Sequence, residues 1–303
     1  MLALIHLDLP AQEALLEYRL ERGKEYQLNI EIEQDSRSES FFNEEISMYN
    51  RLTMLFSVDS TDADANYYLN ARYNDLHISM LAPQMDIDIN SSSGRNPLLS
   101  AMLNLIESEP FRISMDRTGN LLSMDGLEEV HEGLHDFPAS DTLEKKIIIQ
   151  TLDEAYGRRA IQMLFDLFLS YYPEVQPIQN WTNDFNCIFN SREVPSSNRY
   201  YLGKTGEDHI SIQGIGMLSN KVPFEETTTI GQVKSVVSGS QTFDYKIDRK
   251  SAWLLKCISR QRIMIETTVV SSHSLPTGLK MPSFTETYYE VTGEIVESQK
   301  TKK

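Results

Sequence analysis

The sequence predicts an α+β protein in which a duplicated antiparallel β-sheet carries a central helical layer packed on one face. Three observations support this class. Apolar and polar side chains alternate through residues 26–89, helical spacing follows in residues 96–172, and strand-like segments return in residues 210–269. Helices that lie between two sets of strands in the chain are typical of an antiparallel sheet with helices on one face.

A strand–turn–strand unit that occurs twice, at residues 111–122 and 243–255, predicts the duplication. In each copy a Phe leads to an apolar-Asp-Arg step, which contains Asp116 in the first copy and Asp248 in the second. An Asp at the start of a turn accepts hydrogen bonds from its own backbone, and Gly119 or Ser251 three residues later closes the turn. Each copy therefore predicts a β-hairpin.

The strands of the first part follow from period-two patterns, because one face of each strand is apolar and the other is polar. The three Asp of residues 59–64 lack the Gly and the terminal Glu of a calcium loop, so we interpret them as a polar hairpin tip. The clearest inward positions are Tyr26, Leu28, Ile30, Ile32, Leu52, Met54, Phe56, Val58, Tyr67, Leu69, Ala71, Tyr73, Met85, Ile87 and Ile89.

Four helices are expected in the middle of the chain, at residues 96–110, 126–135, 141–157 and 158–172. Asn96 and Pro97 suit the N-cap and first turn of the first helix. We expect residues 1–172 to hold the N-terminal strands and central helices, and residues 173–303 to form a strand-rich C-terminal half, within one continuous fold.

The composition excludes several classes of partner. A formal net charge of −16 disfavours nucleic acid and anionic membrane surfaces. No apolar run is long enough to span a membrane. The apolar start at Met1–Ile5 lacks a basic region and is interrupted by His6, so we predict no signal peptide in this chain. Cys187 and Cys257 predict either two separate buried thiols or one disulfide in an oxidising compartment.

Three stretches resemble a family of uncharacterised bacterial cell-envelope proteins that are usually exported and often lipid-anchored. They are residues 22–28, residues 111–126, and the Tyr172-Pro173-Glu174 stretch that leads to Trp181 and the second hairpin. The resemblance implies a curved antiparallel sheet with helices on its concave face, similar to lipoprotein carriers. It also implies a periplasmic or envelope location, although a cytoplasmic one stays open, and it implies no activity or catalytic residues.

The segment His131-Glu132-Gly133-Leu134-His135 matches the H-E-x-x-H pattern. On a helix both imidazoles would share one face and could bind zinc, with Glu154 as third ligand and Glu132 activating a bound water. The alternative is structural, because Asp136 and Pro138 end the helix and the two His flank a core-facing stripe. We favour the structural interpretation and expect no metal and no cofactor.

The apolar helix predicted at residues 158–172 offers a second candidate site. We interpret this helix mainly as part of the core. The functional alternative is that it lines an apolar groove under the sheet. The candidate groove residues are Met163, Leu164, Phe165, Leu167 and Phe168. A lone G-x-G at Gly214-Ile215-Gly216 lies in a strand pattern, so we expect a β-bulge and not a phosphate loop.

These observations favour a non-enzymatic envelope protein that binds a hydrophobic small molecule or a protein partner. The alternative function is a zinc-dependent hydrolase or peptidase built on residues 131–135.

Overall fold

The computed structural model describes residues 16–39, 45–83, 85–91, 97–128, 133–134, 142–173, 179–189, 192–228 and 231–297. Its elements are β1 (Lys24–Ser38), β2 (Glu45–Thr61), β3 (Tyr67–Ala82), β4 (Met85–Asn90), α1 (Pro97–Ser108), β5 (Phe111–Met115), β6 (Leu121–Asp125), α3 (Thr142–Tyr156), α4 (Arg158–Phe168), β7 (Asn180–Phe189), β8 (Arg192–Thr205), β9 (His209–Ser219), β10 (Phe224–Thr228), β11 (Gly231–Asp248), β12 (Leu254–Ser271) and β13 (Lys280–Glu297).

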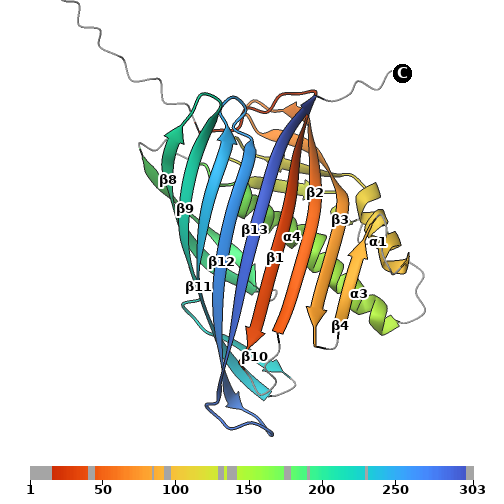
Figure 1. The fold of residues 1–303 in the computed structure, drawn as a ribbon, viewed down its shortest axis with the longest axis vertical. Coiled ribbons are helices and arrows are strands. Elements are labelled where there is room, and N and C mark those ends of the chain that lie inside the picture. Colours follow the sequence, from red (N-terminus) through yellow and green to blue (C-terminus); the bar gives the residue numbers. More distant parts are fainter. Residues whose placement is uncertain are drawn as a thin grey trace, which may run out of the picture.

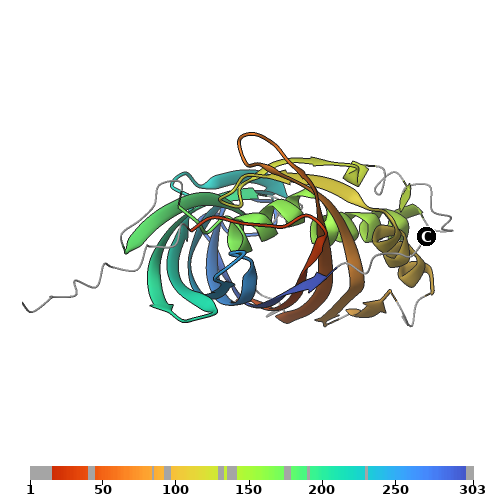
Figure 2. The same ribbon diagram turned by 90° about the horizontal axis from the view of Figure 1, so that it is seen from above.

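All these strands belong to one antiparallel sheet, whose order is β6-β5-β3-β2-β1-β13-β12-β11-β9-β8-β7, with β4 paired to β3 and β10 to β11. The first strand, β1, pairs along its full length with residues 283–297 of the last strand, β13, at the centre of the sheet (Figure 1). Viewed from above, the sheet curves around α4 (Figure 2). Strands from the two ends of the described chain therefore meet at a seam in the middle of the fold.

The predicted α+β class is wrong, because the described residues form a β-rich fold with few helices. Strands β11, β12 and β13 each have 18 residues, whereas α1, α3 and α4 have 12, 15 and 11. Several inward positions on the C-terminal strands hold buried polar residues, such as Asn198, Gln241 and Gln261. These strands therefore lack the regular alternation of apolar and polar residues that indicates a strand in the sequence. In place of a broad helical layer, α4 and the C-terminal part of α3 lie in the hollow of the sheet (Figure 2). Leu152 and Tyr156 of α3 belong to the same core as α4, and α4 contacts the edge strands β6 and β7.

Both predicted hairpins are confirmed, as β5–β6 and β11–β12. Asp116 Oδ1 accepts hydrogen bonds from the backbone N–H groups of Thr118 and Asn120, at 2.8 and 2.9 Å. Asp248 Oδ2 accepts them from Lys250 and Ser251, at 3.1 and 2.7 Å. The duplication itself stays a prediction.

The polar segment at residues 59–64 also lies at a hairpin tip, between β2 and β3, as predicted. Asp62 Oδ1 accepts hydrogen bonds from the N–H groups of Asp64 and Asn66, each at 2.9 Å. Three hairpins of the sheet are thus closed by an Asp that caps its own turn.

The predicted bulge at Gly214 and Gly216 is wrong, because β9 keeps a regular register with β8 and β11 through both glycines. A Cβ at Gly214 would lie 2.7 Å from a ring carbon of Tyr200, and one at Gly216 would lie 1.9 Å from Asn198 Oδ1. The two glycines leave room above β9 for the side chains of Tyr200 and Asn198 from β8 and of Phe243 and Gln241 from β11, which meet across it.

Three of the predicted helices correspond to α1, α3 and α4. Half of residues 126–135 lies outside the described residues, and the described Leu127, Glu128, Gly133 and Leu134 are helical. Helix α4 ends at Phe168, earlier than predicted, because Tyr171 and Tyr172 are packed into the core with ring centroids 4.5 Å apart. Cys187 and Cys257 are buried free thiols, which confirms the first of the two alternatives.

Candidate functional site

The most promising site is a groove of about 930 Å³ on the concave side of the sheet, where β1 ends and β2 begins. The junction of α3 and α4 covers it on one side. We call it the concave groove. It is lined by Gln34, Ser36, Arg37, Ser38, Ile46, Met48, Met80, Gln150, Asp153, Glu154, Arg158, Arg159, Ala160, Met163, Ile265, Ser283 and Thr285.

The floor of the concave groove follows directly from strand register. Successive side chains of a strand point to opposite faces, so the residues that continue the inward set of Tyr26, Leu28 and Ile30 also face the groove. On β1 these are Gln34, Ser36 and Ser38. The groove therefore begins where the inward face of β1 changes from apolar to polar.

Hydroxyl groups meet across the β1–β13 seam in the floor of the groove. Ser36 lies opposite Thr285 and Ser38 lies opposite Ser283. The Oγ of Ser36 and the Oγ1 of Thr285 are 3.1 Å apart and form a hydrogen bond. We call these four residues the hydroxyl ladder.

Apolar side chains flank the hydroxyl ladder on both sides. Met48 lies opposite Gln34 on one side and Met80 on the other, and Ile46 lies opposite Ser36. On the far side of the seam, Ile265 lies opposite Ser283. The floor is thus a polar strip between two apolar walls, with Met163 above it from α4.

The helices that cover the groove are held to the sheet at the α3–α4 junction. The hydroxyl of Tyr156 donates to Asn50 Oδ1 at 3.0 Å, and the hydroxyl of Tyr73 donates to the Tyr156 carbonyl at 2.7 Å. A Cβ at Gly157 would lie 2.1 Å from Asp153 Oδ1, so the tight junction needs glycine.

The C-terminal end of α4 is fixed as firmly as its start. Its last carbonyl groups lack partners within the helix, and buried tyrosines supply donors. The hydroxyl of Tyr245 donates to the Leu167 carbonyl at 2.6 Å, and that of Tyr18 donates to the Leu169 carbonyl at 3.0 Å. Hydrogen bonds to buried tyrosines therefore hold α4 in place at both ends of the helix.

Charges of both signs lie where the helices border the groove. Arg158 donates to Glu128 Oε1 at 2.6 Å and to the Met124 carbonyl at 2.7 Å. Glu154 accepts a hydrogen bond from Gln150 at 3.0 Å. Because Asp153 and Arg159 also line the groove, this border has no single sign of charge.

The interior next to the groove contains a row of amide side chains. Gln241 donates to Asn198 Oδ1 at 2.6 Å, and Gln261 donates to Gln241 Oε1 at 3.0 Å. Burial raises the pKa of Asp166 on α4 to about 6 and that of the Cys187 thiol to about 12. A thiol with so high a pKa stays protonated and is a poor nucleophile.

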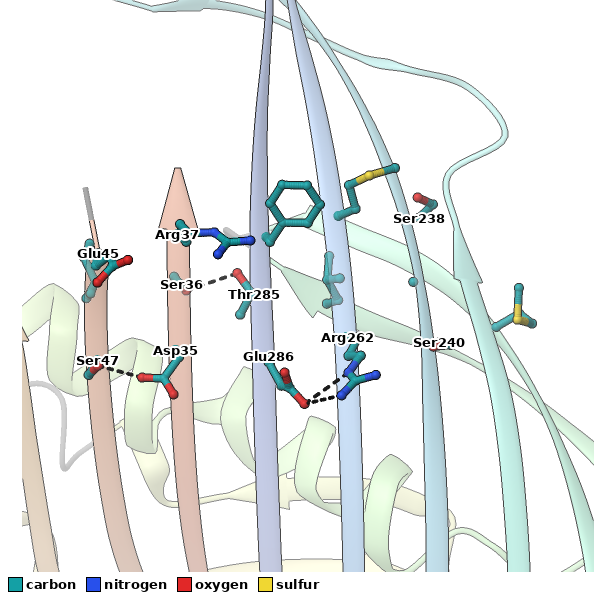
Figure 3. A pocket seen from close by; sticks show the side chains of 16 residues that line it. Asp35, Ser36, Arg37, Glu45, Ser47, Ser238, Ser240, Arg262, Thr285 and Glu286 are labelled. Atoms are coloured by element: carbon teal, nitrogen blue, oxygen red, sulfur yellow. Dashed lines mark hydrogen bonds and ion pairs between the residues drawn. The ribbon is translucent and has the colours of Figure 1, made fainter. Parts of the chain in front are cut away.

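A second hollow, of about 710 Å³, lies near the same end of the sheet. The side chains of Arg262 and Glu286 form an ion pair there at 2.9 Å, and in Figure 3 the helices lie behind the strands that carry them. Many of its side chains, including Met217, Met264 and Phe284, alternate with inward residues and so belong to the outer face. We call it the outer hollow.

The predicted groove residues separate into two groups. Leu164, Phe165, Leu167 and Phe168 are buried in the main core, whereas Met163 is half-buried and lines the concave groove. The strand residues of the groove were not predicted, because register between distant segments decides which of them meet. The change from apolar to polar along Ile30, Ile32, Gln34 and Ser36 is a sequence signal that could have indicated them.

Of the proposed zinc set, His131, Glu132 and His135 lie outside the described residues. Glu154 is exposed on α3. Within the ranges that the structure describes, no group of three or more His, Cys, Asp or Glu is placed to hold a metal ion. The zinc site therefore stays an untested hypothesis.

The fold and the groove define a β-rich protein with a curved sheet and a covered concave groove. The chain belongs to a family of unknown function (DUF6263), whose model matches residues 64–254. This match confirms the sequence resemblance to a family of uncharacterised proteins. No curated protein matches the chain. Within the described part of the chain, no helix combines the length and the apolar character needed to cross a membrane.

Solved structures with some likeness include OpdQ of Pseudomonas aeruginosa, at 8% identity over 92% of this chain and 100% of that chain, with a TM-score of 0.23. A protein of Bacteroides fragilis, described as exported and as having a YmcC-like fold, is 8% identical over 88% and 95%, with a TM-score of 0.15. OpdK of Pseudomonas aeruginosa with vanillate is 7% identical over 90% and 98%, with a TM-score of 0.12. These scores are too low to carry an argument.

Proposed function

We propose that the chain is a non-enzymatic binding protein that holds an apolar or amphiphilic small molecule in the concave groove. The observation that carries this proposal is the groove itself, whose volume of about 930 Å³ is within the usual range for small-molecule sites. Met48, Met80 and Met163 supply adaptable apolar contacts. The hydrogen bonds that fix both ends of α4 support a site that is formed in advance.

Binding of the fluorescent probe N-phenyl-1-naphthylamine tests this proposal. Met163→Glu places a carboxylate in the groove, one helical turn after Arg159, where the opposite charge favours folding. We expect it to weaken probe binding at least about tenfold, because a buried charge must be desolvated. Met48→Lys is a second variant on the opposite wall.

The matched control is Met217→Glu, because Met217 is 68% exposed in the outer hollow. It should bind the probe like the unmodified protein, and circular dichroism should show all three variants folded. Equal probe binding by all folded variants would refute the concave groove as the site.

A protein partner at the outer hollow is the second candidate function. Met217 and Met264 are 68% and 41% exposed there, beside Phe284. Exposed apolar side chains that gather in a hollow mark interaction surfaces. Capture of one partner by the full chain, lost in Met217→Glu and retained in Met163→Glu, would support this function over ligand binding.

We also propose that the protein works in the cell envelope, as the resemblance of its three motifs to exported proteins suggests. Fractionation of cells that produce the full-length protein from its own gene tests this location. Recovery with cytoplasmic markers would refute it.

A further inference from the structure

We propose that the ligand of the concave groove is an uncharged amphiphile, whose hydroxyl, ester or amide groups lie along the hydroxyl ladder. This inference rests on the proposed binding function and names its ligand class. An acylglycerol is a molecule of this class.

The hydroxyl ladder has unused hydrogen-bonding capacity. Each hydroxyl offers one donor and two lone pairs. The bond between Ser36 and Thr285 uses one donor and one lone pair of that pair of hydroxyls. Ser36 Oγ also accepts a hydrogen bond from Gln34 Nε2 at 3.5 Å. One donor and two lone pairs therefore remain at the centre of the floor, and Ser38 and Ser283 add two more hydroxyls on the next pair of positions.

The position of the ladder matches a molecule with both polar and apolar parts. Thr285 is 8% exposed and the other three members are half-buried, so a ligand that covers them must replace their hydrogen bonds to water. A hydrocarbon would leave these groups unsatisfied. An amphiphile can bond to the ladder and place its chain against Met48 and Met80 or against Ile265.

The charges of the groove argue against an ionic head group. The inward-facing strand residues of the floor are all uncharged, from Gln34 and the ladder to Ile46, Met48, Met80 and Ile265. At the border of the groove, Arg158 is paired with Glu128 and Arg37 with Glu39. Arg159 shares the helical border with the carboxylates of Asp153 and Glu154, so the border offers charges of both signs. On the uncharged floor an anion or a cation would lose hydration without an opposite charge beside it, and at the border it would meet charges of its own sign as well as of the opposite sign.

A series of amphiphiles with one chain length tests this inference by isothermal titration calorimetry at pH 8, below their micelle concentrations. The probes are 1-dodecanoylglycerol, dodecanoate and dodecyltrimethylammonium. We expect the acylglycerol to bind at least about tenfold more tightly than either ion. Equal or tighter binding of an ion would overturn the inference.

The double variant Ser36→Ala/Thr285→Val removes the central hydroxyls while keeping the shape of the floor. Two lost hydrogen bonds should weaken acylglycerol binding about tenfold, whereas N-phenyl-1-naphthylamine, which lacks hydroxyl and ester groups, should lose clearly less affinity. The control is Ser240→Ala, an exposed serine of the outer face, which should behave like the unmodified protein.

The outcomes separate the two proposals. If the Ser36→Ala/Thr285→Val variant binds both the fluorescent probe and the acylglycerol normally, the role of the hydroxyl ladder is refuted and the proposed binding function stays intact. If the unmodified protein binds neither the fluorescent probe nor any amphiphile, both proposals fail.

Discussion

Replacing Gly216 with alanine should lower the free energy of unfolding by about 2–4 kcal/mol. The new Cβ would lie 1.9 Å from Asn198 Oδ1 and 2.7 Å from Gln241 Cγ. That Asn198 oxygen accepts a buried hydrogen bond from Gln241 at 2.6 Å. Losing such a bond costs about 1–3 kcal/mol, and overpacking costs about 1–3 kcal/mol more, with some relief as the amides shift.

A double-mutant cycle with Asn198→Ala tests this reasoning by urea unfolding. Asn198→Ala alone should cost about 1–2 kcal/mol, because Gln241 Nε2 keeps its hydrogen bond to Ser196 at 2.8 Å. In the double variant the space left by the amide accepts the new methyl group. The added cost of Gly216→Ala should then fall below about 1 kcal/mol.

Strictly additive losses in this cycle would refute the clash as the cause. A Gly216→Ala protein as stable as the unmodified one would refute the crossing of side chains over β9 altogether.

Three further predictions concern the core. Burial raises the pKa of the Asp166 carboxyl to about 6, so the folded protein holds this proton more tightly than the unfolded chain, and stability falls as the pH rises from about 4 to about 6. Asp166→Asn should therefore be more stable than the unmodified protein by about 1–3 kcal/mol at pH 7.5 and show no gain at pH 4; a gain at pH 4 alone would contradict this. Gly119→Ala should cost about 2–4 kcal/mol in urea unfolding, because Gly119 has φ +92° and its Cβ would lie 2.1 Å from the Leu169 carbonyl oxygen. The control Gly278→Ala, at φ +82° with no atom within 4 Å of the new Cβ, should cost only about 1 kcal/mol. Equal losses of stability in the two variants would refute the clash between Gly119 and the Leu169 carbonyl. Both cysteines should resist a thiol reagent at pH 8 until urea is added, whereas rapid labelling of the folded protein would contradict their burial.

Local features of the fold could be predicted from the sequence because they depend on neighbouring residues. Asp116 and Asp248 cap turns that contain all the partners they need. The helices α1, α3 and α4 follow from spacing within single segments. The balance between helix and strand could not be predicted, since long strands with inward amides, such as β11 and β12, look less regular than apolar ones.

The groove depends on contacts between distant parts of the chain. Ser36 and Thr285 meet only because the first and last strands pair at the centre of the sheet. Likewise, Phe165 and Phe168 are buried because α4 packs inside the curved sheet. Helical spacing alone could not distinguish such core residues from residues that line a groove. Single-segment patterns therefore identified Met163 but could not identify the floor opposite it.

Native mass spectrometry of the full chain, purified gently without detergent or chelator, tests the central claim most directly. We predict an added mass in the lipid range that is lost in Met163→Glu and retained in Met217→Glu. A bare polypeptide mass, or an added lipid mass that survives Met163→Glu, would contradict the concave groove as a ligand site. An added mass of one zinc that disappears in His135→Ala would instead favour the hydrolase hypothesis.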